Sequence, residues 1–181
     1  MRSLGKKILL AVGIALGLLV VILLISVYRL GLFNRVELQQ TSRGPYQIVY
    51  LSHTGPYHQI AEKIDRVGAM LKEKNISRLS ACGIFYDDPR VVPQDQLRSK
   101  GGFLVEGTIS VEAPFGIDSV AQREVILATI KAHPAVAPFK TYPRMNEWVE
   151  QNSYEAAGPG LEIYRADGVI ECELPIQARK Q

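Results

Sequence analysis

The N-terminal part of the chain contains one long apolar run. Residues 8–28 are 21 consecutive positions without a charged side chain. As a helix, this run would be roughly 31 Å long, which matches the hydrocarbon thickness of a bilayer. We therefore expect residues 1–28 to form a short flank of cytoplasmic type followed by a single transmembrane helix, with residues 8–28 as the anchor.

The alternative for this run is a cleavable signal peptide. The apolar core of such a peptide is usually about 7 to 15 residues long, and a small-x-small cleavage site follows it. The run here is longer, and residues 25–29 lack such a site. Basic residues lie on both sides of the run, so Lys6 and Lys7 at its boundary give only a slight preference for a soluble domain outside the cytoplasm.

After a polar segment, residues 29–42, which we interpret as a connector, the pattern becomes that of an α+β domain. Residues 47–51 have the composition of a strand, and the Gly55-Pro56 turn places a proline at the start of a helix. Apolar residues then recur at helical spacings of 4, 3 and 4, at Ile60, Ile64, Val67 and Leu71. Two strands are predicted next, over residues 81–86 and 103–111.

The second half of the chain repeats this order. We predict a strand at 124–130, a helix at 139–151 and two strands at 160–164 and 169–176. The expected core face of this helix consists of Phe139, Tyr142, Met145 and Val149. The element order indicates two β-α-β-β modules, and two unrelated α+β halves are the alternative.

The charge, the histidines and the cysteines of the chain limit which partners and cofactors are expected. Five of the 21 basic residues and one of the 18 acidic residues precede residue 41, so residues 41–181 hold 16 basic and 17 acidic groups. This part of the chain offers no basic stripe for phosphates, and we expect no nucleic-acid partner. The histidines lack metal-ligand spacing, so no structural metal is expected. We expect no cofactor, with haem binding as a minor alternative. Cys82 and Cys172 leave both a disulfide and two buried thiols open.

Several short segments occur in an order typical of one known family. They are His53-Thr54-Gly55-Pro56-Tyr57, Tyr86-Asp87-Asp88-Pro89, Val92-Pro93, Leu97-Arg98-Ser99, Lys140-Thr141-Tyr142 with Trp148, and Glu162-Ile163-Tyr164. With these segments, residues 43–178 resemble the gyrase-inhibitor-like (GyrI-like) family, the effector-binding domain of AraC-type and multidrug-sensing transcription activators. A span joined directly to such a domain further resembles the membrane-anchored branch of this family.

The resemblance implies both a fold and a site. The fold is a pseudo-symmetric pair of modules that share one curved antiparallel sheet, with a ligand groove where the modules meet. Family members bind amphipathic, often cationic molecules there, between aromatic walls and a carboxylate on a late strand, and some hydrolyse strained small molecules. By motif position, the carboxylate falls on Glu162.

Strand alternation adds a separate observation on this acid. Residues 161 and 163 are apolar, so Glu162 and Tyr164 lie on the other face of their strand, as Glu171 and Glu173 do in the last strand. In an aromatic groove, desolvation would strengthen a contact between a carboxylate and a cation and would raise the carboxyl pKa. The alternative is a solvated strand residue, since glutamate is seldom buried.

Three further aromatic residues, Tyr57, Tyr86 and Trp148, complete the expected ligand-binding set with Glu162 and Tyr164. Each either lines the groove or covers the core. The expected function is a membrane-anchored domain that binds a small amphipathic ligand. The alternatives are a small-molecule hydrolase with Glu162 as general base, and a module that docks a protein partner at the membrane surface.

Overall fold

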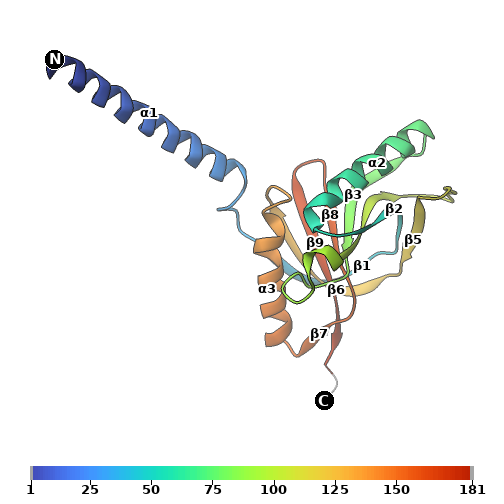
Figure 1. The fold of residues 1–181 in the computed structure, drawn as a ribbon. Coiled ribbons are helices and arrows are strands. Elements are labelled where there is room, and N and C mark those ends of the chain that lie inside the picture. Colours follow the sequence, from blue (N-terminus) through green and yellow to red (C-terminus); the bar gives the residue numbers. More distant parts are fainter. Residues whose placement is uncertain (1, 180–181) are drawn as a thin grey trace.

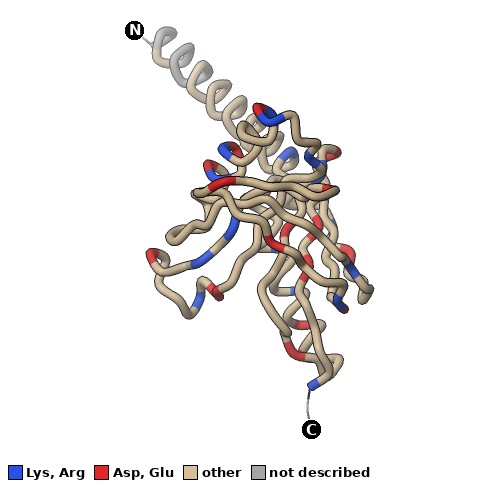
Figure 2. Tube along the Cα trace, turned by 90° about the vertical axis from the view of Figure 1, so that its right-hand side faces the viewer, with Lys and Arg blue, Asp and Glu red and all other residues tan. Residues whose placement is uncertain are grey.

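The computed structural model describes residues 2–179, in which one long helix precedes an α+β domain (Figure 1). The helix α1 (Arg2–Arg29) contains a segment, Ala11–Arg29, that is long and apolar enough to cross a membrane, and the domain buries none of it. Figure 2 shows that this part of α1 carries no charge before its C-terminal end. Such a helix near the N-terminus fits a membrane anchor or a signal sequence.

The domain that follows contains two α-helices, two short 3-10 helices and nine strands among the described residues. They are β1 (Glu37–Arg43), β2 (Tyr46–Thr54), η1 (Tyr57–Gln59), α2 (Ile60–Glu73), β3 (Arg78–Phe85), η2 (Gln94–Gln96), β4 (Arg98–Val105), β5 (Gly116–Val120), β6 (Arg123–Lys131), α3 (Ala137–Gln151), β7 (Tyr154–Ala156), β8 (Gly160–Tyr164) and β9 (Val169–Ala178).

All the strands pair antiparallel, in the order β1-β6-β9-β8-β3-β4-β2-β5, and β7 pairs with β9. The predicted α+β class with an antiparallel sheet and helices is confirmed. The order β-α-β-β occurs as β2-α2-β3-β4 and again as β6-α3-β8-β9, with the short β7 inserted after α3. The pairing of β3 with β8 joins these two halves in the middle of the sheet.

Three predictions about strands were wrong in detail. Residues 37–42, the second part of the predicted connector, form the edge strand β1 together with Arg43. The residues of β1 are mostly polar and do not alternate, so the strand depends on its pairing with β6. The strand expected at 103–111 is β4, which ends at Val105 before Gly107, a glycine with φ of +83°. Strands β5 and β7 were not predicted, because β5 alternates little and β7 has only three residues.

Both α-helices cover the same face of the sheet. A Cβ on Gly101 of β4 would contact Ile60 of α2, so this glycine lies under that helix. Across the sheet, Gly101 is opposite Gly83, Gly83 is opposite Glu162, and Glu162 is opposite Cys172. Cys172 packs with the buried residues of α3. The sheet therefore has a helix-covered face, which includes Glu162, and an opposite face.

The buried stripe of α3 differs from the predicted one. Ala137, Thr141, Met145 and Val149 are buried, whereas Phe139 is 83% exposed. The helix begins two residues earlier than expected, and its i to i+4 stripe starts on a small residue that fits close to the sheet. Met145 and Val149 were placed correctly, but Phe139 was not.

The opposite face is buried without a helix because the sheet curls. Only Gly44 and Pro45 separate β1 from β2, although these strands lie near opposite ends of the sheet order. The curl brings Tyr46 of β2 within hydrogen-bond distance of Glu173 on β9. Apolar residues fill the space enclosed on this face, among them Ile48, Cys82, Ile84, Leu161 and Ile163.

Candidate functional site

Glu162, in the centre of β8, is a buried acidic residue. Its side chain is on the helix-covered face and the residue is only 3% exposed. The neighbours directly across the sheet are Gly83 of β3 and Cys172 of β9. Burial of a carboxylate is costly unless hydrogen bonds or an opposite charge compensate for the lost solvation, so its surroundings decide its state.

Two tyrosines surround this carboxylate. Tyr164, two positions further along the strand, donates a hydrogen bond from Oη to Glu162 Oε2 at 2.9 Å. Tyr142 reaches the same region from α3, and its buried Oη lies close enough to Glu162 to lower the pKa of this carboxyl group, although it makes no hydrogen bond of ordinary geometry in the described part of the chain. A Cβ on Gly160 would lie 2.5 Å from this Oη, so the glycine makes room for the Tyr142 ring. We call Glu162, Tyr164, Tyr142 and Cys172 the acid cluster.

Burial dominates the electrostatics of the acid cluster. Desolvation raises the pKa of Glu162 to about 7, although the hydroxyls of Tyr164 and Tyr142 oppose the shift. Burial also raises the pKa of the Cys172 thiol, and the neighbouring Glu162 raises it further. Near neutral pH, Glu162 is therefore divided between its neutral and charged forms. A nearby cation would favour the charged form.

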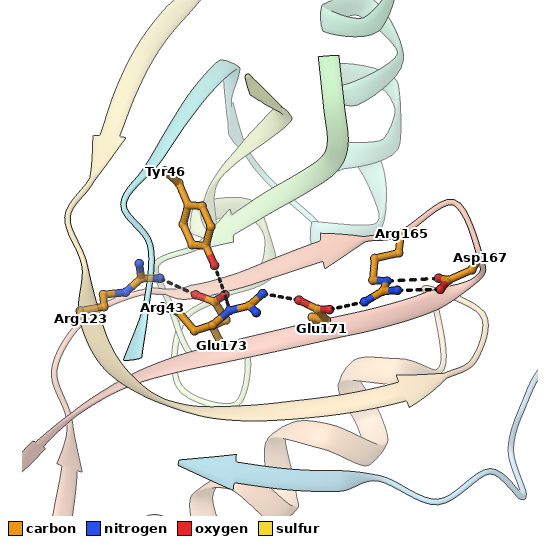
Figure 3. A network of polar contacts seen from close by, with 7 residues as sticks. All are labelled: Arg43, Tyr46, Arg123, Arg165, Asp167, Glu171 and Glu173. Atoms are coloured by element: carbon orange, nitrogen blue, oxygen red, sulfur yellow. Dashed lines mark hydrogen bonds and ion pairs between the residues drawn. The ribbon is translucent and has the colours of Figure 1, made fainter. Parts of the chain in front are cut away.

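The other two buried acids of β9 are in a different situation. Glu173 interacts with Arg43 Nε at 2.9 Å and Arg123 Nη2 at 3.2 Å, and it accepts a hydrogen bond from Tyr46 Oη at 2.7 Å. Glu171 pairs with Arg43 and with Arg165 Nη1, the latter at 2.9 Å. Figure 3 shows these residues as one chain of contacts on the opposite face of the sheet, which we call the arginine network.

The three buried glutamates differ in whether a basic side chain lies close to them. Glu171 and Glu173 each have arginine partners from other parts of the chain. No basic side chain within the described residues lies at ion-pair distance from Glu162, and its side-chain hydrogen bond comes from Tyr164. Of the three buried acids, Glu162 is the one without a basic partner among the described residues.

The remaining predicted ligand-binding residues lie at three different places in the domain. Tyr86 follows β3 on the opposite face, 37% exposed, with Lys100 Nζ 5.6 Å from its ring centroid. Trp148 stacks on Tyr154 at 5.5 Å near the C-terminal end of α3. Tyr57 packs edge-on against Phe85 at 4.9 Å, and the Phe85 ring lies over Gly83, which is paired with Glu162 across the sheet. The structure therefore brings Tyr164 into contact with Glu162, places Tyr57 one strand away on the same face, and places Tyr86 on the other face.

Asp87 and Arg98 fix the loop around Tyr57. Arg98 donates from Nη2 to Asp87 Oδ1 at 2.7 Å, and the Arg98 backbone N–H donates to Asp87 Oδ2 at the same distance. The contact holds the pKa of Asp87 below its usual value. This agrees with the sequence-based expectation that Arg98 pairs with one of the two aspartates.

A small hollow opens on the opposite face beside Tyr86. It has a volume of about 230 Å³, and its lining includes Ile84, Leu161, Arg123 and Pro175. Glu162 does not line it, although Leu161 beside it in the sequence does. The hollow and the acid cluster therefore lie on two faces of the same strand.

Sequence reasoning missed Tyr142 as a neighbour of Glu162 and missed the arginine network. The alternation of two glutamates with apolar residues in the last strand is typical of a half-buried strand with its acids toward solvent, so it gave no signal that Glu171 and Glu173 are buried. Their partners lie up to 130 positions away in the sequence, and no local pattern identifies them. Within the described residues, no group of His, Cys, Asp and Glu is arranged to hold a metal ion.

The chain belongs to the family of GyrI-like small molecule binding domains, whose model matches residues 39–177. DNA gyrase inhibitor 2 of Dickeya dadantii (strain 3937) is similar to it, with 26% identity over 128 residues that cover 68% of this chain and 82% of that protein.

Solved structures share the fold at low identity. The EcmrR C-terminal domain superposes with a TM-score of 0.61 at 16% identity, covering 80% of this chain and 98% of that one. EcmrR in its DNA complex gives 0.67 at 11% identity, and this match covers 79% of the present chain and 58% of the longer EcmrR chain. A hydrolase encoded by lin2189 from Listeria innocua gives 0.52 at 11% identity, covering 79% and 92%.

Proposed function

We propose that this chain is a membrane-anchored binding domain for a small amphipathic cation, and that Glu162 is the counter-charge of the ligand. The observation that carries the proposal is the absence of a basic partner for this carboxylate among the described residues, while Glu171 and Glu173 are both paired. A bound cation would supply the missing charge and restore the ordinary acidity of the carboxyl group. The family assignment to small-molecule binding supports the proposal.

The aromatic part of the site is Tyr164 and Tyr142. Tyr142 places its buried hydroxyl beside Glu162, and its ring belongs to α3, which covers this part of the sheet. A ligand would reach the acid by displacing this part of α3. The proline at position 143 removes one backbone hydrogen bond beside Tyr142, which weakens this turn of the helix. The ligand would then lie between β8 and α3, which both belong to the second module.

The first test is the affinity of the purified full chain for tetraphenylphosphonium, a lipophilic cation. Glu162→Gln keeps the shape of the side chain and removes its charge, and we expect it to weaken binding roughly ten- to a hundredfold. Wild-type affinity should rise with pH through about 7, where Glu162 ionises, and the variant should show no such rise. Isothermal titration calorimetry in detergent measures both.

Two controls locate the site. Glu112→Gln removes one exposed acid elsewhere and should leave affinity unchanged. Tyr86→Ala opens the hollow on the opposite face without touching the acid cluster. Loss of binding in Tyr86→Ala with normal binding in Glu162→Gln would contradict the proposal and assign the ligand to the hollow.

The pKa of Glu162 near 7 also favours a second function, a small-molecule hydrolase in which this carboxylate is the general base that activates water. Turnover that is lost in Glu162→Gln and rises with pH through about 7 would support it. A third function, docking of a protein partner at the membrane surface, predicts capture of that partner unaffected by Glu162→Gln.

A further inference from the structure

The segment that links α1 to the domain is held firmly against it. The His133 backbone N–H donates to the Leu30 carbonyl at 3.1 Å, and Asn34 Nδ2 donates to the Lys131 carbonyl. Gly31 has a φ of +77°, and a Cβ there would lie 2.6 Å from the Lys131 carbonyl oxygen. These contacts fix residues 30–34 on the turn between β6 and α3. They restrict the orientation of the domain relative to the end of α1.

Lysine 140 of α3 strengthens this attachment. Its Nζ donates to the carbonyls of Leu32 and Asn34, the two residues on either side of Phe33. Because Phe139 precedes this lysine, the contact brings the first turn of α3 next to Phe33. Figure 1 shows this end of α3 beside the segment that leaves α1.

Large apolar side chains are exposed at this junction. Phe139 is 83% exposed, Phe33 69% and Leu32 43%, and Tyr28 in the last turn of α1 is 71% exposed. Burial of such side chains is worth about 1.5 to 3 kcal/mol each, so leaving them in water is unfavourable. Aromatic residues are enriched where a membrane protein meets the headgroup region. A cluster of this kind marks a contact surface.

We propose that Leu32, Phe33 and Phe139 form a membrane-proximal face that inserts into the interfacial layer of the bilayer, so that the domain rests on the membrane. The inference depends on the proposed anchoring by α1. If α1 spans the bilayer up to Arg29, Leu32 follows only three residues later and lies at the headgroup level. Basic residues Arg29, Arg35, Lys131 and Lys140 surround the face and match an anionic lipid surface.

The test uses the full chain reconstituted in vesicles of equal parts phosphatidylcholine and phosphatidylglycerol. A polarity-sensitive fluorophore is attached to Phe139→Cys or Phe33→Cys and is quenched by a nitroxide on the lipid headgroup. Cys82 and Cys172 are buried and burial raises the pKa of both thiols, so they resist labelling. We expect a blue-shifted emission and quenching as strong as for a label at Tyr28→Cys.

Leu79→Cys is the matched control, because Leu79 is 51% exposed on β3, after the turn from α2 that lies at the end of the domain away from α1 (Figure 1). Its label should remain in water and unquenched. Labels at Phe33 and Phe139 that behave like the Leu79 label, in vesicles where alkaline extraction shows α1 inserted, would overturn the proposal. A blue shift that depends on protein density, without lipid quenching, would assign the face to a second copy and overturn it as well.

Failure of the anchoring itself has its own signature. A chain that alkaline extraction releases, or that lacks the mass of residues 1–28, would show that α1 is not a membrane anchor. That result removes both the anchoring proposal and the membrane-proximal face. Ligand binding at Glu162 would be unaffected by it.

Discussion

Glu162 shows how far the behaviour of one side chain depends on its surroundings. Three glutamates are buried on β8 and β9, and the desolvation of each has a different compensation. Glu171 and Glu173 form ion pairs with arginines. For Glu162, burial outweighs the hydrogen bond from Tyr164 and moves the pKa to about 7.

The raised pKa of Glu162 predicts a pH dependence of stability. The folded carboxyl has a pKa of about 7 and the unfolded one about 4.5, so between these values the folded chain binds more protons. The stabilising contribution is complete below the lower value and is lost as pH rises to about 7, by about 3 kcal/mol. Urea unfolding of the wild type and of Glu162→Gln, followed through the unfolding transition of the domain at several pH values, measures this loss.

In that experiment, the free energy of unfolding of the wild type should decrease relative to that of the variant as pH rises from about 4.5 to about 7.5. Above this range the difference should stay constant. Parallel pH profiles of the two proteins would show that Glu162 titrates normally and would remove the electrostatic basis of the cation site.

At the scale of elements, α3 combines stability with a local weakness. Its buried stripe, Ala137, Thr141, Met145 and Val149, packs on β6 and β9. Thr141 donates a hydrogen bond to the Ala137 carbonyl, within the same turns that hold Tyr142 against β8. Pro143 removes one backbone hydrogen bond at this point, and the contact of Lys140 with the Leu32 carbonyl holds the first turn from outside the helix.

Pro143→Ala should therefore stabilise α3. Position 143 is exposed, and proline in a helix interior is about 3 kcal/mol less favourable than alanine. We expect the free energy of unfolding to increase by about 1 to 3 kcal/mol and the affinity for tetraphenylphosphonium to fall, because the helix opens less readily. Arg144→Ala, at the next exposed position, should change stability by less than about 0.5 kcal/mol. Tighter cation binding in Pro143→Ala would contradict entry beneath α3.

At the scale of the molecule, the arginine network is what holds the curled sheet closed. Arg43 lies at the end of β1, Arg123 at the start of β6, and Glu171 and Glu173 in β9. Tyr46 of β2 joins them from the other end of the sheet (Figure 3), and burial together with the hydrogen bond to Glu173 raises the pKa of its hydroxyl to about 12. Strands that are separated in the sheet order are thus connected through charged side chains.

Arg43→Lys should reveal the contribution of this connection. Arginine contacts two carboxylates through its planar fork, and lysine offers a single ammonium group that cannot reach both in the same way. We expect a loss of about 1 to 3 kcal/mol in the free energy of unfolding, because Glu173 is completely buried. Arg90→Lys, in the exposed pair with Asp88, should cost less than about 1 kcal/mol. Equal effects of the two substitutions would contradict the closing role of the network.

Local periodicity was enough to predict α1, α2, α3 and six of the strands, because alternation and helical spacing depend only on residues close together in the sequence. It also placed Glu162 and Tyr164 on one face of β8. Strand β1 could not be predicted in this way, since its polar residues become a strand only by pairing with β6.

The sequence by itself determined the class of fold, the apolar N-terminal helix and the family. Only the tertiary structure decided which acids meet arginines, that Glu162 is left beside two tyrosines, and that Phe139 faces outward. The physical reason is range: a residue's backbone preference is set within a few positions, whereas its charge environment is set by strands that the curled sheet brings together from distant parts of the chain.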